Sequence, residues 1–153
     1  NRHTLRRAYW EIALEAFQES SCQLYGNISP SKDHWLSAGS GVSSCPYNLT
    51  FGKKEIRVEL WLSRGSMEEN KFLFDQLFQH KDAIEQAFGY PMEWLRLDEK
   101  KSSRVQYSMA TDGFNKELWP KCIAWHVEQM TKLEMAFKNP LQQAATALKQ
   151  NNK

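Results

Sequence analysis

Serines and lysines that could act as nucleophiles are present, but their spacing fits no catalytic motif. A serine hydrolase places its nucleophile in Gly-x-Ser-x-Gly between a strand and a helix. The nearest match, Ala38-Gly39-Ser40-Gly41, lacks the first glycine. Ser29-Pro30-Ser31-Lys32 has the spacing of Ser-x-x-Lys, but Pro30 disfavours the helix that would bring the lysine beside the serine. Neither motif supports a nucleophilic serine.

Metal chemistry is equally unsupported. The four histidines form no His-x-x-x-His pair, and only Asp33-His34, in a predicted loop, has an adjacent acid. A restriction-type nuclease needs Glu-x-Lys on a strand so that carboxylates hold magnesium beside a lysine. Glu55-Ile56-Arg57 and Glu59-Leu60-Trp61 lack that lysine. We therefore expect no metal and no cofactor.

Overall composition restricts the function classes further. Lys and Arg number 20 against 18 Asp and Glu, so the net charge of +2 gives no strong basic field. No apolar run is long enough for a membrane span, and no secretory signal opens the chain. Three distant cysteines (Cys22, Cys45 and Cys122) predict reduced thiols in a cytoplasmic protein rather than a disulfide framework.

The first predicted element is a helix over residues 4–21, followed by a long irregular connection over residues 22–46. Loops of that length inside compact domains are often functional. The buried face of the helix would carry apolar residues at the i, i+4, i+7 spacing: Leu5, Tyr9, Ile12 and Ala16.

Alternating apolar and polar residues then predict a β-hairpin over residues 47–51 and 55–62, with one buried and one polar face. Ser66 and Glu69 form a capping box that begins a helix running to Phe88. Gly89 supplies the C-terminal stop of that helix.

A second hairpin is predicted from strands at 92–97 and 104–109. Trp119-Pro120 opens a last helix that ends at Asn139-Pro140, and residues 141–153 are expected to be a weakly helical or frayed tail. The order α-ββ-α-ββ-α predicts one α+β domain over residues 1–140. Its sheet would have four antiparallel strands, with the helices mainly on one face.

The polar face of this sheet is the candidate binding surface. Arginine beside an exposed tryptophan suits the backbone and stacked bases of nucleic acid, and equally suits a protein partner. The alternative is a solvated sheet whose tryptophan is covered by the long loop. The face would carry Arg57, Glu59, Trp61, Arg104 and Gln106, with Lys53, Lys54, Lys100 and Lys101 at the hairpin turns.

A series of short motifs resembles the bacterial and archaeal domain-of-unknown-function family 4268 over residues 5–138, and the run from Asn70 to Arg104 is the most specific part. The motifs are Arg7-Ala8-Tyr9-Trp10, Trp35 to Gly41, Arg57-Val58-Glu59-Leu60, Glu69-Asn70-Lys71, Phe74-Asp75-Gln76-Leu77, Lys81 to Glu85, Gly89, Glu93-Trp94, Ser103-Arg104-Val105 and Trp119-Pro120.

The resemblance implies an accessory role rather than a catalytic one. Such domains often stand at the C-terminal end of longer proteins, some with a nuclease-like domain, in restriction or phage-defence settings. A chain that begins at Asn1 rather than Met fits a piece of a longer protein. No catalytic residue can be carried over. The polar and aromatic motif positions are candidates for a shared site or for structural roles: Asn70, Lys81, Glu85, Trp94 and Arg104.

The leading prediction is a non-enzymatic module that binds nucleic acid or a partner protein. Its candidate residues are Arg57, Trp61, Lys100, Lys101, Arg104, Ser37, Ser40 and Asn70, with the loop from Ser37 to Gly41 at the rim. A small enzyme is the first alternative, with a site gathered around the long loop from Asp33, His34, Ser40, Asn70 and Arg104. A homodimer or interdomain brace is the second.

Overall fold

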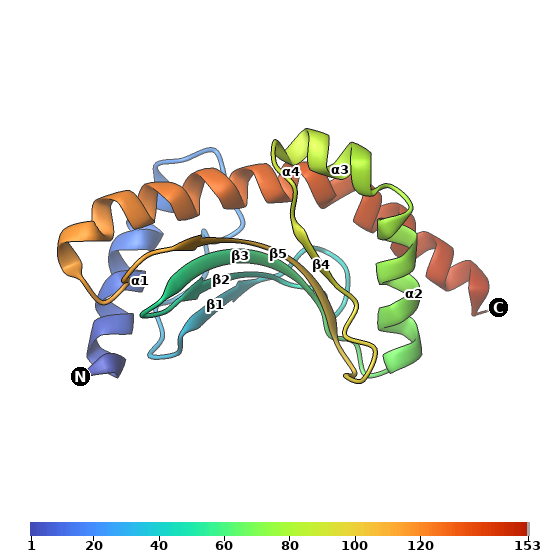
Figure 1. The fold of residues 1–153 in the computed structure, drawn as a ribbon, viewed down its shortest axis with the longest axis horizontal. Coiled ribbons are helices and arrows are strands. Elements are labelled where there is room, and N and C mark those ends of the chain that lie inside the picture. Colours follow the sequence, from blue (N-terminus) through green and yellow to red (C-terminus); the bar gives the residue numbers. More distant parts are fainter. Residues whose placement is uncertain (153) are drawn as a thin grey trace. The chain divides into compact units, whose positions relative to one another are not determined.

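A computed structural model describes residues 1–152 and shows an α+β fold (Figure 1). Within these residues, four α-helices accompany a five-stranded antiparallel sheet. The elements in chain order are α1 (Arg2–Gln18), β1 (Trp35–Ala38), β2 (Tyr47–Phe51), β3 (Glu55–Leu62), α2 (Met67–Phe78), α3 (Lys81–Phe88), β4 (Glu93–Leu95), β5 (Ser103–Ala110), a short 3-10 helix (Lys116–Leu118) and α4 (Trp119–Asn151).

The sheet has one strand more than predicted. Its order is β1-β2-β3-β5-β4, so β1 adds an edge strand from within the segment that the sequence analysis treated as irregular. Leu36 and Ala38 are buried at alternate positions of β1, and the backbone N–H of Phe51 donates to the carbonyl of His34 at 2.8 Å. Four residues flanked by loop residues are too short a run for alternation to be recognised.

The first hairpin is buried more completely than a one-sided sheet would be. Ile56, Val58, Leu60 and Leu62 are buried on one face of β3, as predicted. All five residues of β2 are buried as well, including the polar Asn48 and Thr50. The face opposite the apolar one carries the predicted polar residues but is only partly exposed: Glu59 and Gln106 are 5% and 7% exposed.

Helix α1 buries a different face from the predicted one. Tyr9 is buried as expected, but Ile12 is 47% exposed, and Trp10, Ala13, Leu14 and Phe17 are buried instead. Aromatic packing explains the rotation. The Tyr9 ring stacks on Phe51 of β2 with centroids 4.1 Å apart, and it meets the Trp119 ring edge-on at 5.3 Å.

The predicted helix from Ser66 to Phe88 is two helices. Its start is confirmed, since the Ser66 hydroxyl accepts the N–H of Glu69 at 3.2 Å, and so is its end at Gly89, whose φ is +108°. At His80 the backbone leaves the helical region (φ −110°, ψ 21°), which separates α2 from α3. No proline or glycine marks the break, so propensity alone could not locate it.

Helix α4 continues through Pro140, where the sequence predicted a stop. Figure 1 shows it as one continuous ribbon, and it reaches Asn151. The segment predicted as a frayed tail is therefore helical. Leu141, Ala144 and Leu148 are buried, at the 3–4 residue spacing of a packed helix face. Tertiary burial has overridden the cost of an interior proline.

The chain divides into two compact units, and each is described by itself. Unit 1 comprises residues 1–38, 48–58 and 107–131, and unit 2 comprises residues 39–47, 59–106 and 132–153. Unit 1 centres on the rings of Tyr9, Trp10, Phe51 and Trp119. Unit 2 centres on Trp94, whose ring contacts Phe74, Phe78 and Phe137. The single domain over residues 1–140 stays a prediction.

Candidate functional site

An open hollow of about 300 Å³ lies in unit 2, beside the end of β3. Five residues line it, and we call it the basic hollow: Trp61, Ser63, Arg64, Lys101 and Ser102. It brings together an aromatic ring, two cationic side chains and two serines. Two of the five, Trp61 and Lys101, were predicted from the sequence.

One wall of the basic hollow is fixed by the loop over residues 39–46. The N–H groups of Trp61 and Ser63 donate to the carbonyls of Pro46 and Ser44, both at 3.0 Å. The Arg64 guanidinium donates through Nη1 to the Ser43 carbonyl at 3.1 Å. The alternation of β3 buries Leu60 and Leu62, so Trp61 between them points to the opposite face.

The other wall is held by Asn70 of α2. Its side-chain Oδ1 accepts the N–H of Arg64 at 2.8 Å, while Nδ2 donates to the carbonyls of Arg64 and Lys101 at 3.0 and 2.9 Å. Asn70 itself is fully buried. It is therefore a positioning residue, which ties the two segments that carry the hollow's cations.

Lys71, the next residue of α2, binds the turn over residues 96–103, which includes Lys101 and Ser102 of the hollow. Its ammonium donates to the carbonyls of Arg96, Leu97 and Ser102 at 2.6–2.8 Å, and to the Ser103 hydroxyl at 2.9 Å. Leu97 has a φ of +57°, an uncommon conformation for a leucine. A buried lysine surrounded by four acceptors fixes residues 96–103. The sequence did not predict this role of Lys71.

Trp61 differs from the other five tryptophans of the chain. Trp10, Trp94 and Trp119 donate their indole N–H to protein oxygens, while Trp35 and Trp125 pair with neighbouring rings. Within residues 1–152, Trp61 makes neither an indole hydrogen bond nor a ring contact. It lines the basic hollow and is partly exposed, so its ring is available to a ligand.

The cations of the basic hollow are unequally engaged. Arg64 forms a 2.7 Å ion pair with Glu69 through Nε. Among the described residues Lys101 has no ion pair, and the same holds for Lys100 beside it; both are exposed. An exposed lysine without a carboxylate partner is free to neutralise an incoming anion.

Arg104 lies on β5, the strand next to β3 in the sheet. Val105 is fully buried, so Arg104 and Gln106 share the opposite face. The Nε of Arg104 donates to Gln106 at 2.9 Å, and Gln106 donates to Glu93 at 3.2 Å. These hydrogen bonds hold Arg104, Gln106 and Glu93 in place. Within the described residues, only the Nε of the Arg104 guanidinium forms a hydrogen bond.

The remaining predicted residues lie elsewhere. Ser40 is in unit 2, where its hydroxyl and Val42 form a local turn. Ser37 and Arg57 are in unit 1; the Ser37 hydroxyl donates to Asn48, and Arg57 lies 3.7 Å from Glu55. Their part in a binding surface stays a prediction. Arg64, Ser63 and Ser102 were missed because they belong to loops rather than to the alternating strands.

The structure gives no support to the enzyme alternative, because the residues proposed for its active site make separate local contacts. Asp33 and His34 lie in unit 1; the Asp33 carbonyl accepts the indole N–H of Trp10, and the His34 ring meets Trp35 edge-on. In unit 2 the amide of Asn70 is fully engaged and Ser40 bonds only within its turn. Among residues 1–152, no three histidine, cysteine or acidic side chains gather closely enough to hold a metal ion.

Three further motif positions have structural contacts. Glu85 of α3 accepts the N–H of Met92 at 2.7 Å and the indole N–H of Trp94 at 3.0 Å. Lys81 stands 4.0 Å from the Glu85 carboxylate at the i, i+4 spacing. The Glu85 contacts connect α3 to β4, and Lys81 also lines an open hollow of about 520 Å³ formed by residues 78–83.

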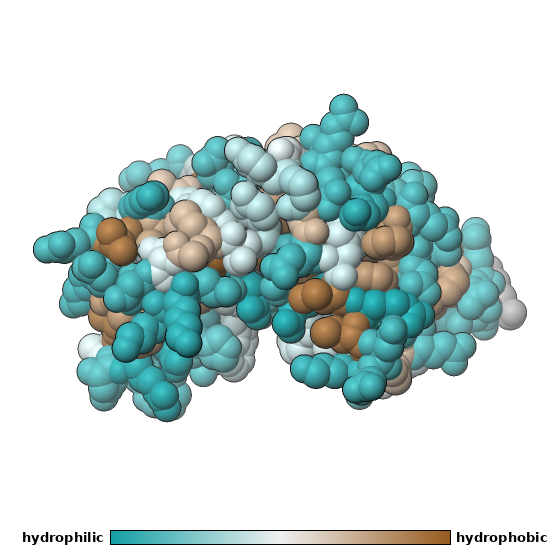
Figure 2. Space-filling model, in the orientation of Figure 1, coloured by the Kyte–Doolittle hydropathy of each residue, from teal (hydrophilic) through white to brown (hydrophobic). Residues whose placement is uncertain are grey.

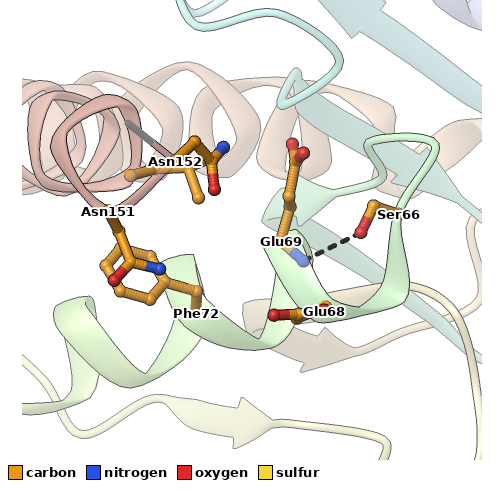
Figure 3. Close-up of a pocket in the computed structure, with 7 residues that line it drawn as sticks. Ser66, Glu68, Glu69, Phe72, Asn151 and Asn152 are labelled. Atoms are coloured by element: carbon orange, nitrogen blue, oxygen red, sulfur yellow. Dashed lines mark hydrogen bonds between the residues drawn. The ribbon is translucent and has the colours of Figure 1, made fainter.

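A second, smaller hollow of about 120 Å³ lies in unit 2 where α2 begins and α4 ends (Figure 3). Glu68 and Glu69 are its acids, and Figure 3 shows their side chains pointing in different directions. The Glu69 carboxylate is already paired with Arg64. Because the two carboxylates do not converge, this hollow is a weaker candidate than the basic hollow.

The surface is mostly hydrophilic on the face drawn in Figure 2, where apolar groups form small separate areas. A broad apolar patch would mark an extended protein interface. In the described chain, no helix has both the length and the apolar character needed to cross a membrane.

Fold and site together describe an α+β module with an open hollow lined by basic and aromatic side chains. The chain belongs to a family described as a domain of unknown function (DUF4268), whose model matches residues 5–141. Neither the curated proteins nor the solved structures include a match to the chain.

Proposed function

We propose that this chain is a non-catalytic binding module that contacts nucleic acid through the basic hollow. The observation that carries the proposal is Trp61: a partly exposed tryptophan whose indole has neither a ring contact nor a hydrogen bond within the described chain, in a hollow shared with Lys101. Aromatic rings beside lysine and arginine are the common elements of nucleic-acid grooves, where the cations contact phosphates.

The rigidity of the hollow supports the same function. Asn70 and Lys71 fix both segments that carry the cations, so little ordering entropy would be lost on binding. The nearly balanced charge of the whole chain predicts modest affinity that depends on a local contact. A DNA-metabolism, restriction or defence setting and a cytoplasmic location stay predictions.

The test is a binding titration with labelled single-stranded DNA, duplex DNA and RNA, from low to physiological salt. We expect binding at low salt that weakens as salt rises, because neutralised phosphates release counterions. Lys101→Glu should weaken binding at least several-fold and reduce the salt slope by about one contact. Lys101 is exposed, so thermal stability should be unchanged.

Lys138→Glu is the matched control, because Lys138 is also exposed in unit 2 and lies on α4, and it is not among the residues of the basic hollow. Equal affinity of Lys101→Glu and the unmodified chain would remove the hollow from the function. No binding to any of the three polymers at low salt would overturn the proposal and favour a protein-binding module or a brace. Light scattering after size exclusion would then establish the oligomeric state.

A further inference from the structure

The dimensions and chemistry of the basic hollow discriminate between forms of nucleic acid. Its volume of about 300 Å³ is at the lower limit of small-molecule pockets, enough for a planar group but not for a double helix. In a duplex the flat faces of the bases are stacked on one another and are hidden from a protein side chain. An indole in such a hollow can use its face only on a base that has left the stack.

We infer that the basic hollow takes one unstacked base of a single strand, with Trp61 as its stacking partner. This inference rests on the proposed function. Lys101 stands at the hollow with its ammonium unpaired among the described residues, in position to contact the phosphate beside that base. Arg64 is less available, because its Nε is bound to Glu69 and its Nη1 to Ser43.

The hollow contains little that could distinguish one base from another. The Ser63 hydroxyl donates to the Ser44 carbonyl at 2.8 Å, so its proton is already used. The Ser102 hydroxyl has no hydrogen bond within the described chain and can pair with any base edge. Stacking is itself tolerant of sequence, because every base has a π face. The module should therefore prefer single strands without a strong sequence preference.

The experiment compares three DNA ligands of equal length on the intact chain: a mixed-sequence single strand, its duplex, and a single strand of abasic sites. The unmodified chain should bind the single strand more tightly than the duplex or the abasic strand. Trp61→Ala should lower the affinity for the base-containing strand roughly fivefold to hundredfold and leave the affinity for the abasic strand unchanged. Trp61→Phe keeps an aromatic face and should retain most of the affinity.

Trp35→Ala is the control, since Trp35 is an exposed tryptophan of unit 1. Should Trp61→Ala fail to fold, Trp61→Phe and the abasic strand still test the inference. A duplex bound as tightly as the single strand, or an abasic strand bound as tightly as the base-containing one, would overturn the inference and leave the proposed function standing. Absence of binding to all three ligands and to RNA would overturn both.

Discussion

His126 forms a buried hydrogen-bonded pair with Tyr9 in unit 1. His126 is fully buried, with its Nε2 3.0 Å from the Thr50 carbonyl and its Nδ1 2.7 Å from the Tyr9 hydroxyl. A carbonyl can only accept, so Nε2 carries the proton and Tyr9 donates to Nδ1. Burial also raises the pKa of Tyr9, so its hydroxyl stays protonated. This pair braces the core of unit 1 and is inaccessible to a ligand.

The stability of the protein should depend on the protonation of His126. Burial lowers the pKa of His126 from its ordinary 6.5 to about 4, although its hydrogen bonds to backbone carbonyls oppose the shift. Between these two values the unfolded chain binds a proton that the folded chain does not. The stabilising contribution is therefore complete above about pH 6.5 and is lost as the pH falls toward 4, by roughly 3 kcal/mol.

The measurement is urea unfolding at several values between pH 7 and 4. His126→Gln offers one donor for Thr50 and one acceptor for Tyr9 but does not titrate, so the dependence in this range should flatten. His80→Gln is the control, because His80 is exposed and its side chain does not cap α3. An unchanged pH dependence in His126→Gln would show that His126 is not the group responsible.

At the scale of elements, the second turn of α2 determines the shape of the basic hollow. Asn70 and Lys71 are adjacent, and together they bind the carbonyls of residues 64, 96, 97, 101 and 102. Burial and the nearby Arg96 lower the pKa of Lys71 below its ordinary value, although Asp98 and Asp75 oppose the shift. The three carbonyls and a hydroxyl around the ammonium also favour its charged form. Helix α2 therefore holds the turn over residues 96–103 as well as packing in the core.

Lys71→Met should loosen the turn over residues 96–103. Methionine keeps the apolar stem but leaves buried carbonyls without a donor, which should lower the free energy of unfolding by roughly 2–4 kcal/mol. Hydrogen exchange should accelerate most in residues 97–103, and affinity for single-stranded DNA should fall although Lys71 does not line the basic hollow. Lys81→Met, which removes an i, i+4 contact with Glu85 and a cation–π contact with Phe78, is the control. Unchanged exchange in residues 97–103 would contradict this role.

The sequence predicted these elements where a pattern extends over many residues and failed where contacts decide. Alternation located β2 and β3, and the Ser66 capping box located the start of α2. The sequence pattern could not show that α4 continues beyond Pro140, because that depends on the burial of Leu141 and Leu148 in the folded chain. Alternation also predicted that Trp61 lies on the face of β3 opposite Leu60 and Leu62, while its part in a binding site stays a prediction. Arg64 was not predicted because it lies between β3 and α2, where no strand or helix pattern applies. Asn70 and Lys71, two polar residues on the apolar face of α2, were the sequence signal that could have indicated a site at this position.

At the scale of the whole molecule, four elements of the described chain have residues in both compact units. Strands β2, β3 and β5 and helix α4 are each divided between unit 1 and unit 2, at residues 47–48, 58–59, 106–107 and 131–132. Unfolding either unit would interrupt the hydrogen bonding of these four continuous elements. We therefore expect the chain to unfold in one cooperative transition, as a single domain does.

Leu148→Ala tests this expectation from the C-terminal end of α4. Leu148 is 5% exposed in unit 2, and truncating a buried leucine should lower the free energy of unfolding by about 2–4 kcal/mol. If the chain unfolds as one domain, exchange of slow amides in β2, at Leu49 and Phe51 of unit 1, should accelerate by the same free energy as exchange in unit 2. Lys149→Ala, at an exposed neighbouring position, should change neither. Acceleration restricted to unit 2 would show that the two units unfold separately, because the shared elements would then open at the unit boundary rather than along their whole length.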